Sequence, residues 1–162
     1  MMDTFEVKKQ SNEFTDRLEL KGELQFEVYE HGELVREFVD HNLIVDNGRE
    51  LVTKLLAEAG APRAIGQISF GNNNMPESVY DTEIIDGYVK PIKSFEYPAL
   101  GQVLFNFELE PEENNGEFGT GVEICEFGLL TVGGTLFARR VIDEPIQKKD
   151  YTRIIGRWRI LV

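Results

Sequence analysis

Alternation of apolar and polar residues over two long segments is the feature that most limits the fold of this chain of 162 residues. In segments 18–28 (LELKGELQFEV) and 153–162 (RIIGRWRILV), one set of alternate positions is apolar or glycine throughout. Successive side chains of a strand point to opposite faces, so this pattern is typical of strands with one buried face. Segment 103–109 repeats it with Val103, Phe105 and Phe107. The sequence therefore predicts an antiparallel sheet that packs on one side.

Turn signals between these segments favour a sandwich of short strands. EHGE at 30–33 and TVGG at 131–134 each predict a hairpin turn, and 110–121 is an acidic, glycine-rich connection. One helix is expected at about residues 47–59, capped by Asp46 or Asn47, with Leu55 on its buried face. The predicted fold is mainly β, an antiparallel β-sandwich with one packed α-helix.

The length suits one domain, because ordinary domains have about 100 to 200 residues. Residues 1–17 are polar with scattered Phe5, Val7 and Phe14, which are too few to build a core. We therefore predict an N-terminal arm over 1–17 and a single sandwich domain over 18–162. An apolar-dotted terminus of this kind commonly orders on a partner, so the arm is expected to dock on another chain.

Composition excludes several classes of protein. The net charge of −12 disfavours binding to phosphate backbones, so no nucleic-acid partner is expected. The chain has no run of about 18 apolar residues and no signal-like N-terminus, so it is expected to be soluble, made in the cytoplasm and without a membrane partner. The lone Cys125 cannot form an internal disulfide and is predicted to be a small buried side chain.

The charge is unevenly distributed along the chain. Residues 139–159 hold seven basic and three acidic side chains, a net +4, which leaves −16 for the rest of the chain. Opposite patches of this kind can attract copies of one protein, but the arginines can equally pair with glutamates of the same domain. Arg139 and Arg140 are successive residues of a strand, so at most one is expected to be buried and the other is available to a neighbour.

Motifs of known enzyme chemistry are absent from the sequence, including the Walker loop, the dinucleotide fingerprint, zinc spacings and the serine elbow. His31 and His41 are isolated and are assigned structural roles. Oxygen donors in GNNNMPESVYD could hold calcium, but they lack the spacing of a calcium loop. The acidic side chains could include a glycosidase pair by chance alone. We therefore predict no catalytic residue, no cofactor and no metal ligand, and the chain is not expected to be an enzyme. The residues weighed for calcium are Asn72, Asn73, Asn74 and Asp81, and those weighed as carboxylate pairs are Glu110, Glu112, Glu113, Glu117, Glu123 and Glu126.

Four segments occur in an order that resembles a family of small virion proteins of tailed bacteriophages. They are HNLIVDNGRELVTKLLA (41–57), IGQISFGNNNMPESVYDTEI (65–84), EICEFGLLTVGGTLFARRV (123–141) and the C-terminal RIIGRWRILV. In that family a strand ends in HN and an apolar run, a helix beginning with GR follows, a P…DT segment comes next, and the end reads LFAR…WRI. The resemblance covers roughly residues 18–162.

The resemblance implies a structural component of the virion, in its tail, baseplate or fibre-attachment region. Its partners would be copies of itself and other virion proteins. Two alternatives stay open: a head decoration or head-fibre anchoring protein, and a carbohydrate-binding module at a receptor-binding tip. The carbohydrate-binding module would need exposed aromatic residues, for which Tyr80, Tyr88, Phe95 and Tyr97 are the candidates. The residues expected at subunit contacts are Phe5, Val7, Phe14, Arg139, Arg140, Arg153, Arg157 and Arg159.

Overall fold

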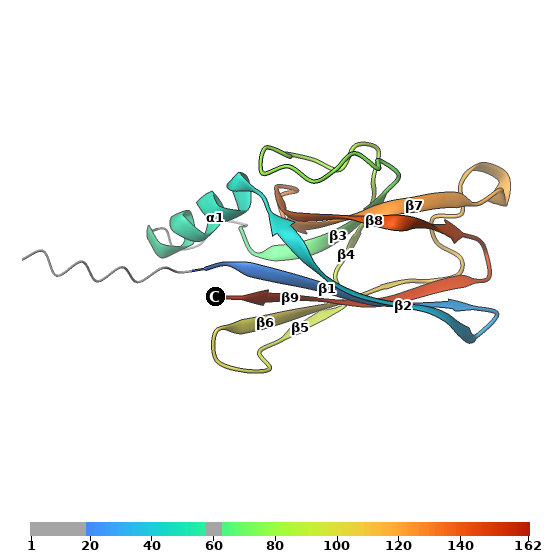
Figure 1. Cartoon of the computed structure of the whole chain (residues 1–162), viewed down its shortest axis with the longest axis horizontal. Helices are drawn as coiled ribbons and strands as arrows, with labels where there is room; N and C mark the ends of the chain where they lie inside the picture. The colour runs from blue at the N-terminus through green and yellow to red at the C-terminus, as the bar shows by residue number, and fades with distance from the viewer. Residues whose placement is uncertain (1–18, 58–62) are drawn as a thin grey trace, which may run out of the picture.

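A computed structural model describes residues 19–57 and 63–162 as a mainly β fold with one α-helix (Figure 1). The predicted fold class is confirmed. In chain order the elements are β1 (Lys21–Glu30), β2 (Glu33–Ile44), α1 (Asp46–Ala57), β3 (Ile65–Gly71), β4 (Tyr88–Pro91), β5 (Ser94–Glu96), β6 (Gln102–Leu109), the 3-10 turn η1 (Glu117–Gly119), β7 (Val122–Thr131), β8 (Leu136–Lys148) and β9 (Thr152–Leu161).

All strands belong to one antiparallel sheet with the order β4-β3-β7-β8-β2-β1-β9-β6-β5, which curls so that its two halves face each other. The long strand β2 forms the corner. It pairs with β1 over most of its length and then with β8 through only two residue pairs, Leu43 with Arg139 and Ile44 with Ala138. On the other side, the link between β4 and β5 hydrogen-bonds to both halves, through Ile92 to Gly66 and Lys93 to Asn106.

Both predicted hairpin turns are present. His31 and Gly32 connect β1 to β2 with φ values of 50° and 78°. A turn with positive φ at both central residues matches the twist of the flanking strands, which explains a glycine at the second position. His31 also stacks on Tyr151, with ring centroids 4.2 Å apart, in agreement with a structural role. The second hairpin joins β7 to β8 over residues 132–135.

The core lies between the two halves of the sheet and is rich in aromatic side chains. Phe26 of β1 stacks on Phe127 of β7 at 4.9 Å, which joins the halves directly. The inward set predicted for the last strand is confirmed, because Trp158 is fully buried with its alternate neighbours on β9. On the same face of β9, Gly156 leaves room for the ring of Phe107, since a Cβ at this position would lie 2.1 Å from that ring.

The helix begins one residue earlier than predicted, and its predicted end lies outside the described residues. Its start is held against β8, where Val45 N donates to Phe137 O at 3.2 Å. Leu51 is buried, but Leu55, which we expected on the buried face, is 53% exposed. That expectation was wrong because the helix lies at one end of the sandwich with β8 as its main contact, so Leu55, one turn after the buried Leu51, stays at the surface (Figure 1).

No sequence pattern predicts β4 and β5, the two outermost strands of the sheet. Both are short, and most of their side chains are exposed. Edge strands have a partner on one side only and need no buried face, so they leave little alternation to detect.

Candidate interaction surface and the buried Arg139 network

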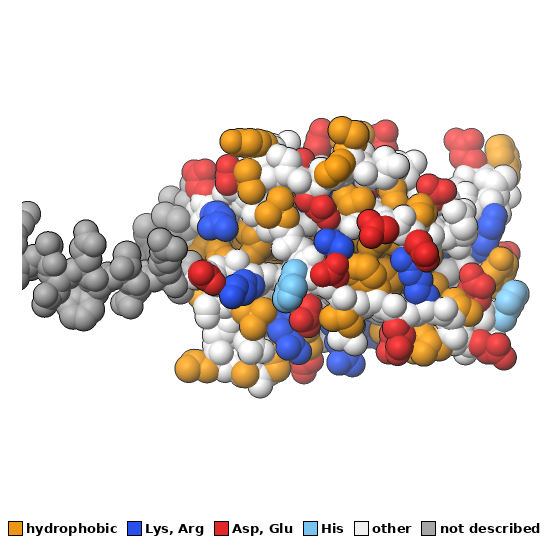
Figure 2. All heavy atoms as spheres, in the orientation of Figure 1, with side chains coloured by type: hydrophobic (Ala, Val, Ile, Leu, Met, Phe, Trp, Pro, Cys, Tyr) orange, Lys and Arg blue, Asp and Glu red, His pale blue; other side chains and the backbone are white. Residues whose placement is uncertain are grey.

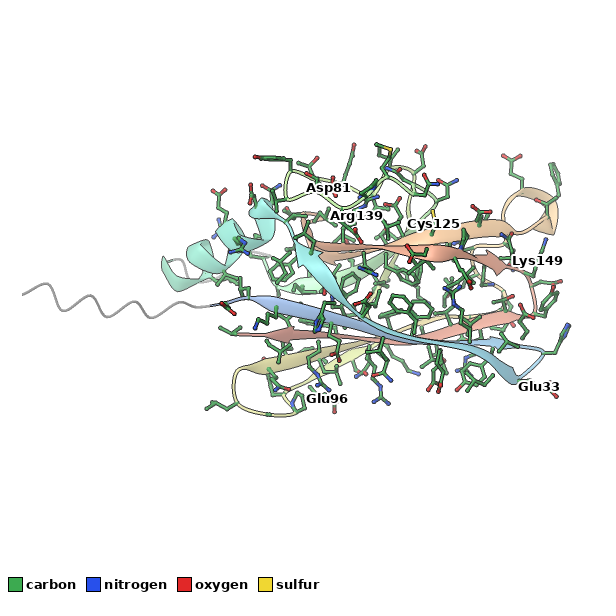
Figure 3. All side chains as sticks on the ribbon, in the orientation of Figure 1. Glu33, Asp81, Glu96, Cys125, Arg139 and Lys149 are labelled. Carbon is green, nitrogen blue, oxygen red and sulfur yellow. The ribbon has the colours of Figure 1, made fainter. Side chains whose placement is uncertain are left out.

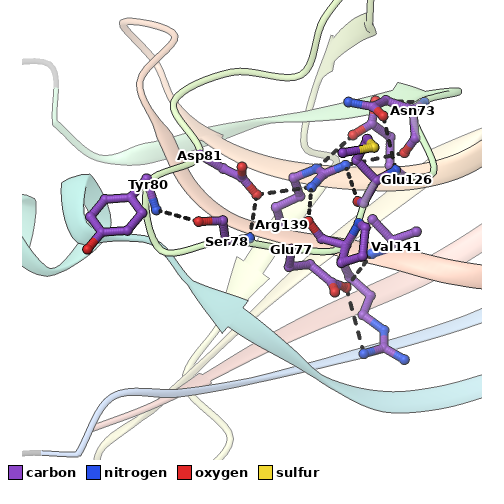
Figure 4. Close-up of polar contacts among 11 residues, drawn as sticks. Asn73, Glu77, Ser78, Tyr80, Asp81, Glu126, Arg139 and Val141 are labelled. Atoms are coloured by element: carbon purple, nitrogen blue, oxygen red, sulfur yellow. Dashed lines mark hydrogen bonds and ion pairs between the residues drawn. The ribbon is translucent and has the colours of Figure 1, made fainter.

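Arg139 of β8 is the centre of the largest buried polar network that the described residues form (Figure 4). Its Nε donates to Glu126 Oε2 at 2.8 Å, and its Nη1 donates to Asp81 Oδ2 at 3.0 Å. The remaining donors bind the loop after β3, through the carbonyl oxygens of Asn73 at 3.2 Å and Met75 at 3.1 Å. One guanidinium therefore binds β7 and both ends of the loop 72–81.

The network satisfies the charges it buries. Glu126 is 1% exposed, and its second oxygen accepts the backbone N–H of Asn73 at 3.1 Å. Burial alone would lower the pKa of Arg139, but the hydrogen bonds to Glu126 and Asp81 outweigh burial and raise it. Arg139 therefore stays charged and acts as a fixed cation that orders the loop.

This arrangement also bears on the calcium alternative. Asp81 and the carbonyl oxygens of the loop point to the guanidinium, which already supplies positive charge where a cation would bind. Within residues 19–57 and 63–162, no group of three or more His, Cys, Asp or Glu side chains could hold a metal ion. The oxygens of the loop are thus used to bind an arginine of the same chain.

A second polar contact joins β2 to β9. Trp158 Nε1 donates to Asn42 Oδ1 at 2.8 Å, and Asn42 lies opposite Gly22, which has no side chain to block it. Asn42, Asp81, Arg139 and Trp158 all come from the four segments that resemble phage virion proteins. Asp81 binds Arg139, and Asn42 binds Trp158, so the motif residues form contacts that hold the sandwich and its loop together.

Lys148, the last residue of β8, is another fully buried charged side chain. Its Nζ donates to three oxygens at 2.8–3.0 Å, from Pro111, Asn115 and Lys149. Burial lowers the pKa of Lys148, although acidic residues nearby partly oppose the change. The side chain therefore orders the acidic connection between β6 and β7.

Cys125 is buried as predicted, and burial raises the pKa of its thiol.

The arginines expected at subunit contacts have different roles. Arg139 is corrected to an internal role, because it is 2% exposed and its donors bind the same chain. Arg140 points the other way and binds Asp40 at 2.6 Å. Arg153 pairs with Glu108, whose burial would raise its pKa but whose hydrogen bonds from Lys93 and Arg153 lower it. The alternative of pairs within the domain therefore holds for these three arginines.

Arg157 and Arg159 remain on the outer face of β9, on the same side as Arg153. Within the described part of the chain neither forms an ion pair, and the residues opposite Arg157 are Gln25 and Asn106. Figure 2 shows acidic and basic side chains interspersed over the visible face of the domain. Phe5, Val7 and Phe14 lie outside the described residues.

The most distinctive exposed surface is an apolar groove at the end of the sandwich that carries α1. Its volume is about 370 Å³, and its lining comes from α1, the start of β3, β5 and the turn after it, β6, β8 and the end of β9, with Arg63 as a charged residue at its edge. Phe95 and Tyr97 meet edge to face beside it, with centroids 5.8 Å apart, and Tyr97 is 75% exposed. A second apolar hollow, which includes Leu100, adjoins it. Its apolar lining includes Leu55, Phe95, Tyr97, Val103, Ile160 and Val162.

No family model matches the chain, and no curated protein or solved structure is significantly similar to it. Over the described ranges, the structure contains no helix that is long and apolar enough to cross a membrane.

Proposed function

We propose that this chain is a structural component of a tailed-bacteriophage virion, in the tail, baseplate or fibre-attachment region, and that it acts through contacts between subunits. The main support for the proposal is that the motif residues form contacts with one another inside the domain. The four segments whose order resembles virion proteins supply the contacts that hold the sandwich, including Arg139 with Asp81 and Asn42 with Trp158.

The surface supports a role in binding other proteins. The most deeply buried charged groups, Arg139, Glu126 and Lys148, are satisfied by protein atoms of the same domain. Four exposed apolar side chains, Leu55, Phe95, Tyr97 and Val162, line the groove beside α1. Apolar patches on a stable domain commonly mark sites of protein contact.

Labelling of purified phage particles tests the proposal. Particles are banded by density and probed with an antibody against residues 19–162, and gold-labelled antibody locates the chain by electron microscopy. We expect the chain in the particle band and gold at the tail. Particles from a phage that lacks this gene serve as the control. Absence of the chain from washed particles would contradict the proposal.

The same experiment distinguishes the alternatives. Gold over the head would identify a head decoration or head-fibre anchoring protein in place of a tail component. The carbohydrate-binding alternative is favoured by the exposed rings of Tyr80, Phe95 and Tyr97, because stacking on sugars needs accessible rings. Specific binding of the purified chain to host-surface glycans, lost in Tyr97→Ala, would support that role.

A further inference from the structure

Among the described residues, the groove beside α1 is lined almost entirely by apolar side chains. Leu55 on one wall and Val162 on the other are 53% and 58% exposed, although both face other apolar side chains of the groove. Apolar surface in this arrangement gains free energy when another apolar group covers it, at about 25 cal/mol per Å² removed from water. The groove therefore favours an apolar occupant.

The chain that precedes the described domain starts at the same end of the molecule. β1 begins at Lys21, which pairs with Leu161, the neighbour of two groove residues, Ile160 and Val162. Figure 1 shows the start of β1, the C-terminus and α1 together at this end. The first described strand of the domain thus starts beside the groove.

The sequence of that segment has the properties that the groove requires. Leu20 packs against the core, and the alternation of β1 continued backwards assigns position 18, also leucine, to the same inner face. Phe14 lies five residues before Glu19, so an extended chain allows it to reach about 17 Å from there. A short tether raises the effective concentration of such a side chain to the millimolar range.

We propose that the groove beside α1 is the docking site of the N-terminal arm of the same chain, with Phe14 and Leu18 as the apolar side chains that enter it. This differs from the sequence expectation that the arm docks on another chain. It is independent of the virion role, since it needs only this chain. In an assembly, the same contact made with a neighbouring copy would be an exchange of arms.

A spin label on the arm of the full chain tests this directly. Ser11→Cys gives one accessible thiol for a nitroxide, because Cys125 is 1% exposed and burial raises the pKa of its thiol. The methyl signals of Leu55, Val103 and Val162 are then recorded by NMR before and after reduction of the label. We expect these signals to be lost with the active label and restored by reduction.

Matched variants separate docking from mere proximity. Phe14→Asp should restore all three methyl signals and Leu55→Asp those of Val103 and Val162, whereas Val39→Asp, at a position 59% exposed on β2, should leave the loss unchanged. A label at Glu33→Cys, at the end of the sandwich opposite α1 (Figure 3), should not affect the groove. If Leu55→Asp leaves the loss unchanged, the arm passes near the groove without entering it, and the proposal is wrong.

Mixed samples decide which copy supplies the arm. Spin-labelled chain without isotopes is added to isotope-labelled chain without a spin label. We expect no loss of groove signals in this mixture at micromolar concentration. A loss in the mixture, or no loss in either sample, would overturn docking within one chain. The virion proposal is unaffected by either result, because particle labelling tests it separately.

Discussion

Replacing Arg139 tests whether one buried arginine determines the position of the loop 72–81. In Arg139→Met the side chain still fills the space, but Glu126, which is 1% exposed, keeps only the N–H of Asn73 as a partner. Breaking a buried ion pair by removing one partner costs about 3–5 kcal/mol. The carbonyl oxygens of Asn73 and Met75 lose their donors as well. We expect the free energy of unfolding to fall by at least about 3 kcal/mol.

Urea denaturation followed by the fluorescence of Trp158 measures this loss, because the indole is fully buried and its emission changes on unfolding. The matched control is Arg140→Met, the same substitution at the next residue. Arg140 lies on the opposite face, where it forms partly exposed contacts with Asp40, Glu77 and the ring of Phe38, so its loss should cost less than that of Arg139, by about 1–2 kcal/mol or more.

A double variant isolates the interaction itself. Glu126→Gln in the Arg139→Met background removes the unpaired buried charge, so the double variant should be more stable than Arg139→Met alone. Limited proteolysis should cut between residues 72 and 81 faster in Arg139→Met than in the parent. Equal stability of the Arg139→Met and Arg140→Met variants, with equal protection of the loop, would refute the central role of this network.

Three further predictions follow from buried positions. Gly156→Ala should lower the free energy of unfolding by about 1–3 kcal/mol in urea titrations, because the new Cβ meets the ring of Phe107; an unchanged midpoint would contradict that contact. Leu51→Ala should cost about 2–5 kcal/mol and Val39→Ala less than about 0.5, and equal losses would show that α1 does not pack as described. Burial lowers the pKa of Lys148, so the unfolded chain binds more protons just below the usual lysine pKa of about 10.4, and stability should rise with pH there. Lys148→Met should abolish that part of the rise in unfolding titrations, and an unchanged slope would argue against a buried ammonium.

The strands were predictable where one face is buried. The alternation in β1, β6 and β9 identified the inward side chains, including Trp158, because burial of one face imposes period two on the sequence. The exposure of Leu55 was not predictable, because helical spacing defines a face but does not say how far the sheet beneath it extends.

The polar network was predictable only in part. Arg139 and Arg140 are successive residues of one strand, so only one of them can face the core. The neighbouring residues do not show which one, because both arginines lie inside the same strand. The choice depends on Glu126 and Asp81, which are 13 and 58 positions away and meet Arg139 only in the folded chain. The groove was not predicted, because its walls come from separate segments and its exposed residues show no pattern in the sequence.

The adjacent ends of the described domain have a mechanical consequence. Lys21 at the start of β1 pairs with Leu161 at the end of β9, and the two strands are antiparallel. A force that pulls these two ends apart acts across one pair of residues at a time, as in a zipper, and meets little resistance. Partners attached before β1 and at the C-terminus that pull in the same direction would instead transmit their load to one end of the sandwich. The domain is thus suited to be carried at this end, with its far end free of tension.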